Sequence, residues 1–431
     1  MNFFDPQIEK LTRTQLQALQ MEKLSSLLES IYGKNQFYTA KYDDAGVHPG
    51  SIKALDDLSR LPLTTKAELV EAQQQDHPFG LNATFNQAAY TRFHQTSGTT
   101  GEPLRVVDTP ESWEWWGRCW GYVLSGAGLS DQDRIFVPFS FGPFIGFWAA
   151  VEGAKQIKAM MIPGGGRNSL QRLQLMKELD VTAMCCTPTY ALRLAEVADE
   201  AGIDLSKMPL KALINAGEPG ANVPATKARI QTLWDVKCYD HAGASEIGAH
   251  SFECEMQPNG IHLIESEFIV EVLDPIDLKP VPSGEQGELI ITNLGRTGFP
   301  AIRYRSGDLV RLNQEQCSCG RTFARFEGGV LGRADDMVVV RGVNIYPSAV
   351  ENLIRQCHTV GEFRITVSTQ CEMKSLQVEI ELNKEAEDEA AQAYVTQTMQ
   401  NELGLRPEVL VVPFGSLPRF EMKAKRFHIK E

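Results

Sequence analysis

The sequence predicts an α/β protein in which a large N-terminal domain has mainly parallel sheets flanked by helices plus a β-rich subdomain. A small, mobile α+β domain is expected to follow it. Between residues 135 and 246, short apolar runs alternate with helical patterns, which indicates βα units and a parallel sheet. From 267 to 312, strand-like runs are separated by Pro, Gly and Asp turns, which is typical of antiparallel strands. A compact mixed pattern begins beyond residue 332, so we expect domains at 1–334 and 335–431.

The individual elements follow from local patterns. Apolar residues at helical spacing between Ile8 and Tyr42 predict helix, and Thr64 or Thr65 can cap a helix after the Pro62 loop. Trp113, Trp115, Trp116 and Trp120 lie on a predicted helix and are expected to pack in the core. The parallel part should hold strands at 135–139, 181–186, 211–215 and 235–239, with helices at 164–180, at 188–201 and between 215 and 235. The later part should hold strands at 267–273, 287–293, 308–312, 338–340, 364–368, 376–382 and 409–412, and a helix at 386–403.

Composition excludes several classes of protein. A chain of 431 residues with 43% hydrophobic content is long enough for more than one core. Its net charge of −13 argues against nucleic acid or an anionic membrane as the main partner. No basic-then-apolar segment opens the chain, and nine cysteines, an odd number, suit reduced thiols. We therefore expect a cytoplasmic protein, and a homodimer is one option that the sequence leaves open.

One stretch, Thr96 to Pro103, combines hydroxyl side chains with glycines; we call its residues 96–101 the hydroxyl loop. Glycines let the backbone approach a ligand, and consecutive amides and hydroxyls suit phosphate oxygens. An ordinary polar turn is the alternative. No Gly-Lys-Ser/Thr follows, so this is not a Walker A loop, and a cation must come from elsewhere in the chain.

Further polar stretches follow predicted strands. Ala216-Gly217-Glu218-Pro219 and Gly243-Ala244-Ser245-Glu246 lie at the carboxyl ends of strands, where ligands of such sheets gather. Later come Tyr304-Arg305-Ser306-Gly307-Asp308-Leu309, Gly332-Arg333-Ala334-Asp335-Asp336 and a basic tail from Pro418 to Arg426.

With these stretches in this order, the chain resembles the adenylate-forming (acyl-activating) superfamily, and within it the phenylacetate–CoA ligases. The similarity runs nearly from end to end. It includes Phe3-Phe4-Asp5-Pro6, Cys185-Cys186-Thr187-Pro188 and Arg341-Gly342-Val343-Asn344-Ile345-Tyr346-Pro347.

The resemblance implies ATP-dependent activation of an aryl or arylacetic acid as an acyl-adenylate, followed by transfer to CoA. The first step needs charge stabilisation on phosphoryl oxygens by metal and fixed donors. The resemblance assigns Mg²⁺ to Glu246, the ribose to Asp308 and Arg333, and the carboxylate and α-phosphate to Lys423. The implied catalytic residues are Lys423, Glu246 and Arg333. The implied nucleotide-binding residues are Thr96, Ser97, Gly98, Thr99, Thr100, Gly101, Ala216, Gly217, Glu218, Pro219, Asp240, Ser245, Asp308 and Arg333.

The chain departs from the family pattern at two positions. Met422 stands where relatives have a glycine before the lysine, and Lys425 lies two residues further on. Ala242 stands where relatives often place an aromatic residue that stacks on adenine. Either another ring covers the adenine, or the nucleotide pocket is looser.

The resemblance also places the acyl pocket, the hinge and the CoA contacts. The expected acyl-pocket residues are Phe139, Phe141, Gly142, Phe144, Gly146, Ala216 and Ile247, with the alternative that these rings pack only against each other. Asp335 is the expected hinge, and Arg341 and Gly342 the expected CoA contacts.

Cys254, His262, Cys317 and Cys319 are expected to hold a structural zinc ion, because thiolates and an imidazole make a closed tetrahedral set. Their spacing is not a standard finger pattern, but phenylacetate–CoA ligase-like members carry similar positions.

Two other readings stay open. In one, the acid is adenylated but passes to a carrier-protein thiol or an amine. In the other, the chain is a non-catalytic nucleotide-binding, zinc-organised interaction module.

Overall fold

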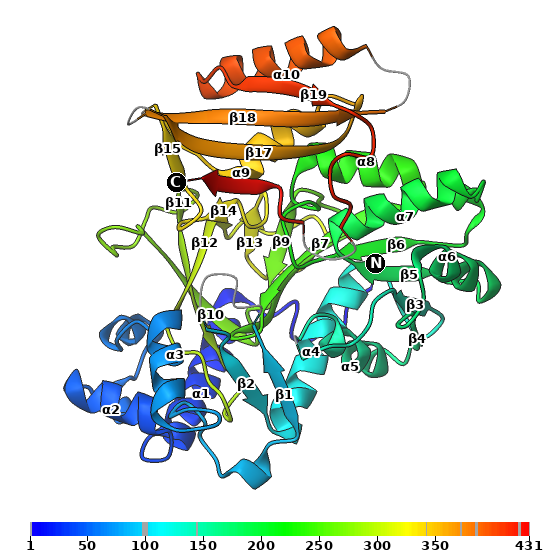
Figure 1. Ribbon diagram of the computed structural model, residues 1–431. Helices are drawn as coiled ribbons and strands as arrows, with labels where there is room; N and C mark the ends of the chain where they lie inside the picture. The colour runs from blue at the N-terminus through cyan, green and yellow to red at the C-terminus, as the bar shows by residue number, and fades with distance from the viewer. Residues whose placement is uncertain are drawn as a thin grey trace.

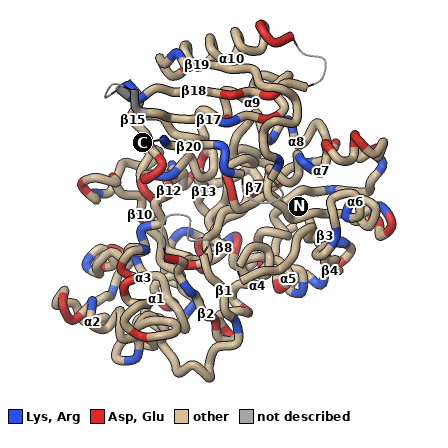
Figure 2. The backbone as a smooth tube through the Cα atoms, in the orientation of Figure 1, with Lys and Arg blue, Asp and Glu red and all other residues tan. Residues whose placement is uncertain are grey.

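The computed structural model describes residues 2–96, 102–143, 145–341, 343–370, 373–383, 387–420 and 424–430. Figure 1 shows a large body in blue to yellow-green and a smaller orange-to-red body stacked on it. The α/β fold class is confirmed, while the boundary at residue 335 stays a prediction. Figure 2 shows acidic and basic residues interspersed over both bodies.

The N-terminal segment forms a helical group at one end of the large body (Figure 1). Thr12 and Thr65 cap α1 and α3 with reciprocal capping boxes, so Thr65 rather than Thr64 is the cap. The elements are α1 (Arg13–Ile31), α2 (Gln36–Asp44), η1 (Pro49–Ser51), η2 (Leu55–Arg60), α3 (Lys66–Gln75) and η3 (Gln87–Ala89).

An antiparallel hairpin of β1 (Arg92–Gln95) and β2 (Arg105–Asp108) comes next. Its connection contains the hydroxyl loop, whose residues 97–101 lie outside the described residues. The helix α4 (Pro110–Gly126) follows, and its four tryptophans are buried, as predicted.

A long mixed sheet crosses the large body in the order β10-β11-β12-β13-β9-β8-β7-β6-β5-β3-β4, with β14 beside β12. The strands β4, β3, β5, β6 and β7 are parallel, and the strands on the other side of β7 are antiparallel. The predicted β-rich part therefore continues the parallel sheet through β7. The strands are β3 (Arg134–Val137), β4 (Met160–Pro163), β5 (Ala183–Cys186), β6 (Ala212–Asn215), β7 (Lys237–Ala244), β8 (Gly248–Glu253), β9 (Gly260–Leu263), β10 (Phe268–Leu273), β11 (Gln286–Asn293), β12 (Tyr304–Asn313), β13 (Arg325–Glu327) and β14 (Gly332–Arg333).

Helices cover both faces of the parallel strands. Successive side chains of a strand point to opposite faces, so Ile135 and Val137 join the core with α4 and α5, whereas Phe136 joins the core with α6, α7 and α8. The remaining elements are α5 (Trp148–Gln156), α6 (Ser169–Glu178), α7 (Pro188–Glu200), η4 (Leu205–Lys207) and α8 (Pro224–Trp234).

Three local predictions differ from the structure. The glycines 164–166 do not open a helix; α6 begins at Ser169, after a capping box at Asn168, because glycine is a poor helix former. The seventh strand runs on to Ala244, so Gly243 lies in a strand rather than a loop. Among the described residues, the strands that the sequence analysis did not predict include β4 and β20 (Phe427–Lys430), as well as β1, β2, β8, β9, β13, β14 and β16 (Val343–Ile345).

The smaller body has a sheet ordered β19-β18-β17-β20, flanked by two helices (Figure 1). The strand β20 pairs in parallel with β17, which ties the basic tail to this body. Its elements are β15 (Val338–Val340), β16 (Val343–Ile345), α9 (Pro347–Arg355), β17 (Val360–Gln370), β18 (Met373–Leu382), α10 (Asp388–Leu403) and β19 (Glu408–Val412). Within the described residues, no helix combines the length and apolar character that crossing a membrane requires.

Candidate active site and metal cluster

The turn between β7 and β8 carries Ser245 and Glu246. Arg296 donates from Nη1 to the carbonyl oxygens of Ser245 at 2.7 Å and Glu246 at 3.0 Å. Its Nε and Nη2 donate to the Asp108 carboxylate at 2.6 and 2.8 Å, and this ion pair is fully buried. A charge pair of this kind is costly to break. Arg296 therefore holds the Glu246 turn in a fixed place beside the β1–β2 hairpin.

Lys66 supplies a cation to this region, and the sequence analysis did not single it out. Its Nζ lies 2.9 Å from Glu246 Oε1, and the lysine side chain is 45% exposed against 7% for the glutamate. The signal that could have found it is the missing lysine of the hydroxyl loop, combined with a lysine at the first position of the capped helix α3.

The described edge of the hydroxyl loop is closed by two hydrogen bonds. The Thr96 N–H donates to Leu104 O at 3.0 Å, and the Leu104 N–H donates to Thr96 Oγ1 at 3.0 Å. The Thr96 hydroxyl oxygen is thus already used as an acceptor within the hairpin.

Asp308 and Arg333 are cross-strand partners on β12 and β14. Arg333 Nη1 lies 3.4 Å from Asp308 Oδ1 and donates to Ser306 O at 3.2 Å. Gly307, between Ser306 and Asp308 in the sequence, has φ +76°. A Cβ on this residue would come within 2.7 Å of Arg333 Nη2, so the position favours glycine. Burial raises the pKa of Asp308 to about 6, against the opposing effect of Arg333. The strand pairing thus brings together the two residues expected at the ribose.

Arg333 also makes a two-pronged ion pair with the expected hinge residue, Asp335. Its Nε and Nη2 donate to the two carboxylate oxygens at 2.8 and 2.9 Å. The hinge candidate and the ribose candidate are therefore directly joined.

The expected adenine region lies where β6 and β7 end. Ala216 to Pro219 directly follow β6, while Asp240 and Ala242 lie on β7. A Cβ built on Gly329 would come within 2.8 Å of Asp240 Oδ2, so this carboxylate packs closely against the Gly329 backbone. Burial and then the neighbouring Glu253 raise the pKa of Asp240 to about 7.

Glu218 is used differently from its neighbours. Its Oε1 accepts the Thr189 N–H at 2.9 Å, and its Oε2 accepts the Ala424 N–H at 2.7 Å. The carboxylate therefore joins the large body to the C-terminal segment.

The expected acyl-pocket rings form a contiguous aromatic group. The ring centroid of Phe139 lies 5.0 Å from that of Phe147 and 5.7 Å from that of Phe141. Phe141 in turn lies 4.3 Å from Trp148, whose Nε1 donates to Gly142 O at 3.0 Å. Phe147 ends the loop 138–147 beside which the acyl pocket was expected, whereas Trp148, the next residue, was missed by the sequence analysis.

The other acyl-pocket candidates differ in position. Gly146 has φ +39°, Ala216 is half-buried beside the main core, and Ile247 is fully buried in that core. Phe144 lies outside the described residues.

The C-terminal candidates are only partly described. Met422 and Lys423 lie outside the described residues, as does Gly342, whereas Lys425 is exposed. Arg341 is exposed in the turn between β15 and β16, with φ +50°.

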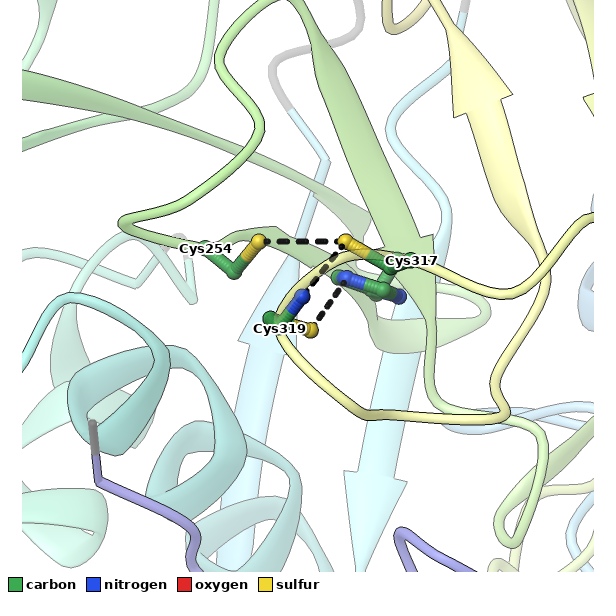
Figure 3. Close-up of side chains that lie close together, drawn as sticks. Cys254, Cys317 and Cys319 are labelled. Carbon is green, nitrogen blue, oxygen red and sulfur yellow. Dashed lines mark hydrogen bonds between the residues drawn. The ribbon is translucent and has the colours of Figure 1, made fainter.

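Cys254, His262, Cys317 and Cys319 form one buried cluster, in which all four ligand atoms lie within 4.8 Å of one another. Figure 3 shows the three labelled cysteines turned toward a common centre. The Cys254 and Cys317 sulfurs are 3.8 Å apart, and Cys319 Sγ is 3.4 Å from His262 Nε2. The β9–β13 pairing and the loop after β12 bring these residues together.

The donor set fits a tetrahedral zinc ion. Zinc–sulfur bonds of about 2.3 Å place two sulfurs about 3.8 Å apart, which matches the observed separation. His262 Nδ1 lies 3.1 Å from Phe323 O, where an N–H would donate and leave Nε2 free to bind metal. The hydrogen bond from Cys254, and more weakly that from His262, lowers the pKa of the Cys319 thiol.

Two known families of protein domain match this chain. The model of the AMP-binding enzyme family matches residues 44–296, and the model of the AMP-binding enzyme C-terminal domain matches residues 342–429. The chain is 31% identical to a phenylacetate–coenzyme A ligase of Thermus thermophilus, over 97% of each chain. It is 32% identical to the ligase of that name from Escherichia coli, over 98% of this chain and 96% of the relative.

A 2-hydroxyisobutyryl-CoA ligase is similar in structure. In its postadenylation state with R3-HIB-AMP it matches with a TM-score of 0.93 and 29% identity, over 98% of this chain and 91% of that chain. In its thioesterification state with 2-HIB-AMP and CoA, it matches over the same shares with a TM-score of 0.75 and 30% identity. The resemblance drawn from the motifs is confirmed: the chain belongs to the AMP-binding enzyme family, and its near-full-length relatives include phenylacetate–CoA ligases.

Proposed function

We propose that this protein is an AMP-forming acid–CoA ligase that activates an aryl or arylacetic acid. The acid is joined to AMP from ATP with release of pyrophosphate, and CoA then takes the acyl group as a thioester and releases AMP. The observation that carries this proposal is the identity of 31 and 32% to phenylacetate–coenzyme A ligases over nearly the whole chain. The pairing of Asp308 with Arg333 beside the Glu246 turn supports it.

In this proposal the nucleotide lies across the carboxyl ends of β6 and β7. The Asp308 carboxylate accepts hydrogen bonds from the ribose hydroxyls, and Arg333 donates to the same sugar. Ala216, Gly217, Pro219, Asp240 and Ser245 line the adenine end, and the hydroxyl loop cradles the triphosphate.

Glu246 would hold Mg²⁺, which supplies charge neutralisation at the phosphoryl oxygens. The carboxylate fits this role because its backbone is fixed by Arg296 and its side chain reaches a partly exposed cation. With Mg²⁺ held by Glu246, Lys66 would be free to neutralise charge on the β- and γ-phosphates. Lys423 completes the charge stabilisation at the α-phosphate and the acid.

The aromatic group around Phe139, Phe141 and Trp148 forms the wall against which the aryl ring of the acid packs. Offset and edge-on ring contacts of this kind add to the free energy of burial. Gly142 and Gly146 leave room beside that wall, with Ala216 at its nucleotide end.

The second half-reaction uses the small C-terminal domain in another orientation, with Asp335 as hinge and Arg341 and Gly342 next to CoA. Asp335 is suited to this because it lies between the strands β14 and β15 and its side chain is held by Arg333. Proline fixes φ near −65°, so Asp335→Pro should retain pyrophosphate release in a single turnover and lose thioester formation.

The experiment that tests the function is a pyrophosphate-release assay across a panel of aryl, arylacetic and aliphatic acids. Activity with arylacetic acids, and thioester formed only when CoA is added, is the expected result. Turnover with aliphatic acids alone contradicts the aryl assignment. Acyl transfer to a carrier-protein thiol or an amine in place of CoA supports the alternative acceptor, and no release with any acid contradicts the enzyme assignment.

We also infer that the cysteine–histidine cluster binds a structural zinc ion. Four protein ligands close the coordination sphere, which leaves no position for a reactive water. The matching sulfur separation and the Phe323 carbonyl beside His262 Nδ1 support this proposal.

A further inference from the structure

The C-terminal segment 424–426 is hydrogen-bonded to two residues of the large body, Glu218 and Thr189. Glu218 Oε2 accepts the N–H of Ala424 at 2.7 Å. Arg426 Nη1 donates to Thr189 Oγ1 at 3.1 Å. Ala424 is the next residue after Lys423 in the sequence. The hydrogen bond from Ala424 to Glu218 therefore holds the chain directly after the expected catalytic lysine.

Glu218 is well placed to hold this segment. Its other oxygen accepts the Thr189 N–H at 2.9 Å, in the first turn of α7. The first N–H groups of a helix have no partner within the helix and favour a negative charge. One carboxylate thus satisfies two backbone donors from separate bodies, and both of its oxygens are occupied.

The segment 424–426 is firmly attached to the smaller body. Arg426 donates from Nε and Nη2 to the two carboxylate oxygens of Glu362 at 2.5 and 2.9 Å, and both side chains are buried. The Ile365 N–H donates to Arg426 O at 2.8 Å, at the start of the β17–β20 pairing. A contact that fixes Ala424 therefore also fixes the position of the C-terminal sheet to which this segment is bound.

The other contacts across this interface are of a different kind. A cavity of about 420 Å³ lies between α7, α8 and the C-terminal body, lined by residues that include Arg229, Arg355 and Arg419. Arg419 pairs with Glu196 of α7 at 3.5 Å, but it also pairs with Glu381 of its own body. Arg229 also donates from Nη1 to Val360 O at 2.5 Å, and the Ala225 N–H donates to Asn352 Oδ1 at 3.4 Å, across the same interface. A polar interface that holds a cavity suits a contact that opens during turnover.

We propose that Glu218 is a positioning residue for adenylate formation. It latches the C-terminal body in the orientation used for adenylate formation, and the latch opens for the CoA step. This proposal rests on the ligase function proposed above. Besides the hydrogen bonds, a structural comparison supports it. The chain matches a ligase in its postadenylation state with a TM-score of 0.93, and the same ligase in its thioesterification state with a TM-score of 0.75.

The test compares Glu218→Gln with the wild-type protein in both half-reactions. A glutamine offers one acceptor oxygen where two N–H donors need one each, so its NH₂ group must face a donor. We expect single-turnover pyrophosphate release to fall about tenfold or more, with CoA transfer from supplied acyl-adenylate within about twofold of wild type. An equal fall in both half-reactions, or no fall in either, overturns the proposal.

The matched control is Glu196→Gln, which removes another carboxylate that contacts the C-terminal body. Glu196 holds a half-buried ion pair with a separation of 3.5 Å, and Arg419 keeps its Glu381 partner, so little change is expected. If Glu196→Gln slows adenylation as much as Glu218→Gln does, the effect belongs to the interface in general and the proposed latch is wrong.

Hydrogen exchange of segment 420–430 gives a readout without substrate. Glu218→Gln should speed exchange at the Ala424 amide at least tenfold while exchange in β5 and β6 stays unchanged. Unchanged exchange at Ala424 contradicts the latch. If exchange responds but no acid is activated by the wild-type protein, the latch stands as a structural contact, and the proposed function together with the catalytic role of Glu218 is wrong.

Discussion

Lys66 Nζ lies 2.9 Å from Glu246 Oε1, so the candidate magnesium ligand is paired with a lysine from a distant part of the chain. The hydroxyl loop contains no lysine, and Lys66 is the cation that the described site brings to this carboxylate. The pair places one positive and one negative group where metal and triphosphate must meet. A bound metal would compete with Lys66 for the Glu246 carboxylate. The lysine would then be free to turn toward the phosphates.

Lys66→Met should reduce adenylate formation about 100-fold, because a fixed charge at a developing phosphoryl transition state contributes on that order. Acyl transfer to CoA from supplied acyl-adenylate should be unaffected, since that substrate has no β- or γ-phosphate. Stopped-flow pyrophosphate release and thioester formation measure the two steps. Lys41→Met is the control, because Lys41 pairs with Glu68, which lies on the same helix as Lys66. Equal loss in the two variants would contradict a specific role for Lys66.

Adenosine binding should weaken as pH falls below 6. Burial raises the pKa of Asp308 to about 6, so the carboxylate is ionised at pH 7 and becomes protonated as pH falls. The ionised form is the better acceptor for ribose hydroxyls. The Kd of adenosine, which carries no titrating phosphate, should rise toward about tenfold per pH unit below pH 6. Calorimetry at pH 5 to 8 measures this. Asp308→Asn should bind weakly and keep only the pH dependence that Asp240, with its pKa of about 7, contributes. A wild-type profile with the same shape as that of Asp308→Asn would rule out this role.

Lys423→Ala should abolish most adenylate formation and spare thioester formation from supplied acyl-adenylate. The expected loss is about 10²–10³-fold in rate, since the lysine supplies charge at the α-phosphate. Lys425→Ala is the matched control, because Lys425 is exposed. Both half-reactions are followed separately in single turnover. A harmless Lys423→Ala with a damaging Lys425→Ala would show that the catalytic lysine is misassigned.

Protein purified without added metal should contain close to one zinc ion per chain, measured by elemental analysis. Cys319→Ser should lose that zinc and lower the unfolding temperature by roughly 5 °C or more, because bound metal stabilises only the folded state. The control is Cys357→Ser, a buried cysteine outside the cluster, which should retain the zinc. Zinc-free wild-type protein, together with an unchanged unfolding temperature for Cys319→Ser, would exclude the zinc site.

Much of the fold was predictable because its signals are local. The alternation of apolar runs and helical patterns from 135 to 246 predicted β3, β5, β6 and the helix α7, and Thr65 was recognisable as a cap. These features depend on hydrogen bonds and side-chain spacing within a few residues. The predicted start of α6 at the glycines 164–166 is wrong. The local signal that begins this helix is the Asn168 cap, which lies a few residues further on.

The order of the polar motifs along the chain determined the family, the reaction class and the identity of most candidate site residues. Tertiary structure alone decided which of them meet. Cys254 and Cys317 are 63 residues apart and touch because β9 pairs with β13, and Asp308 faces Arg333 through the register of β12 and β14. Lys66 reaches Glu246 within the large body, and Glu218 reaches Ala424 across the interface with the C-terminal body. Strand register and packing between distant segments depend on the burial of whole faces at once, and no local stretch of sequence carries that information.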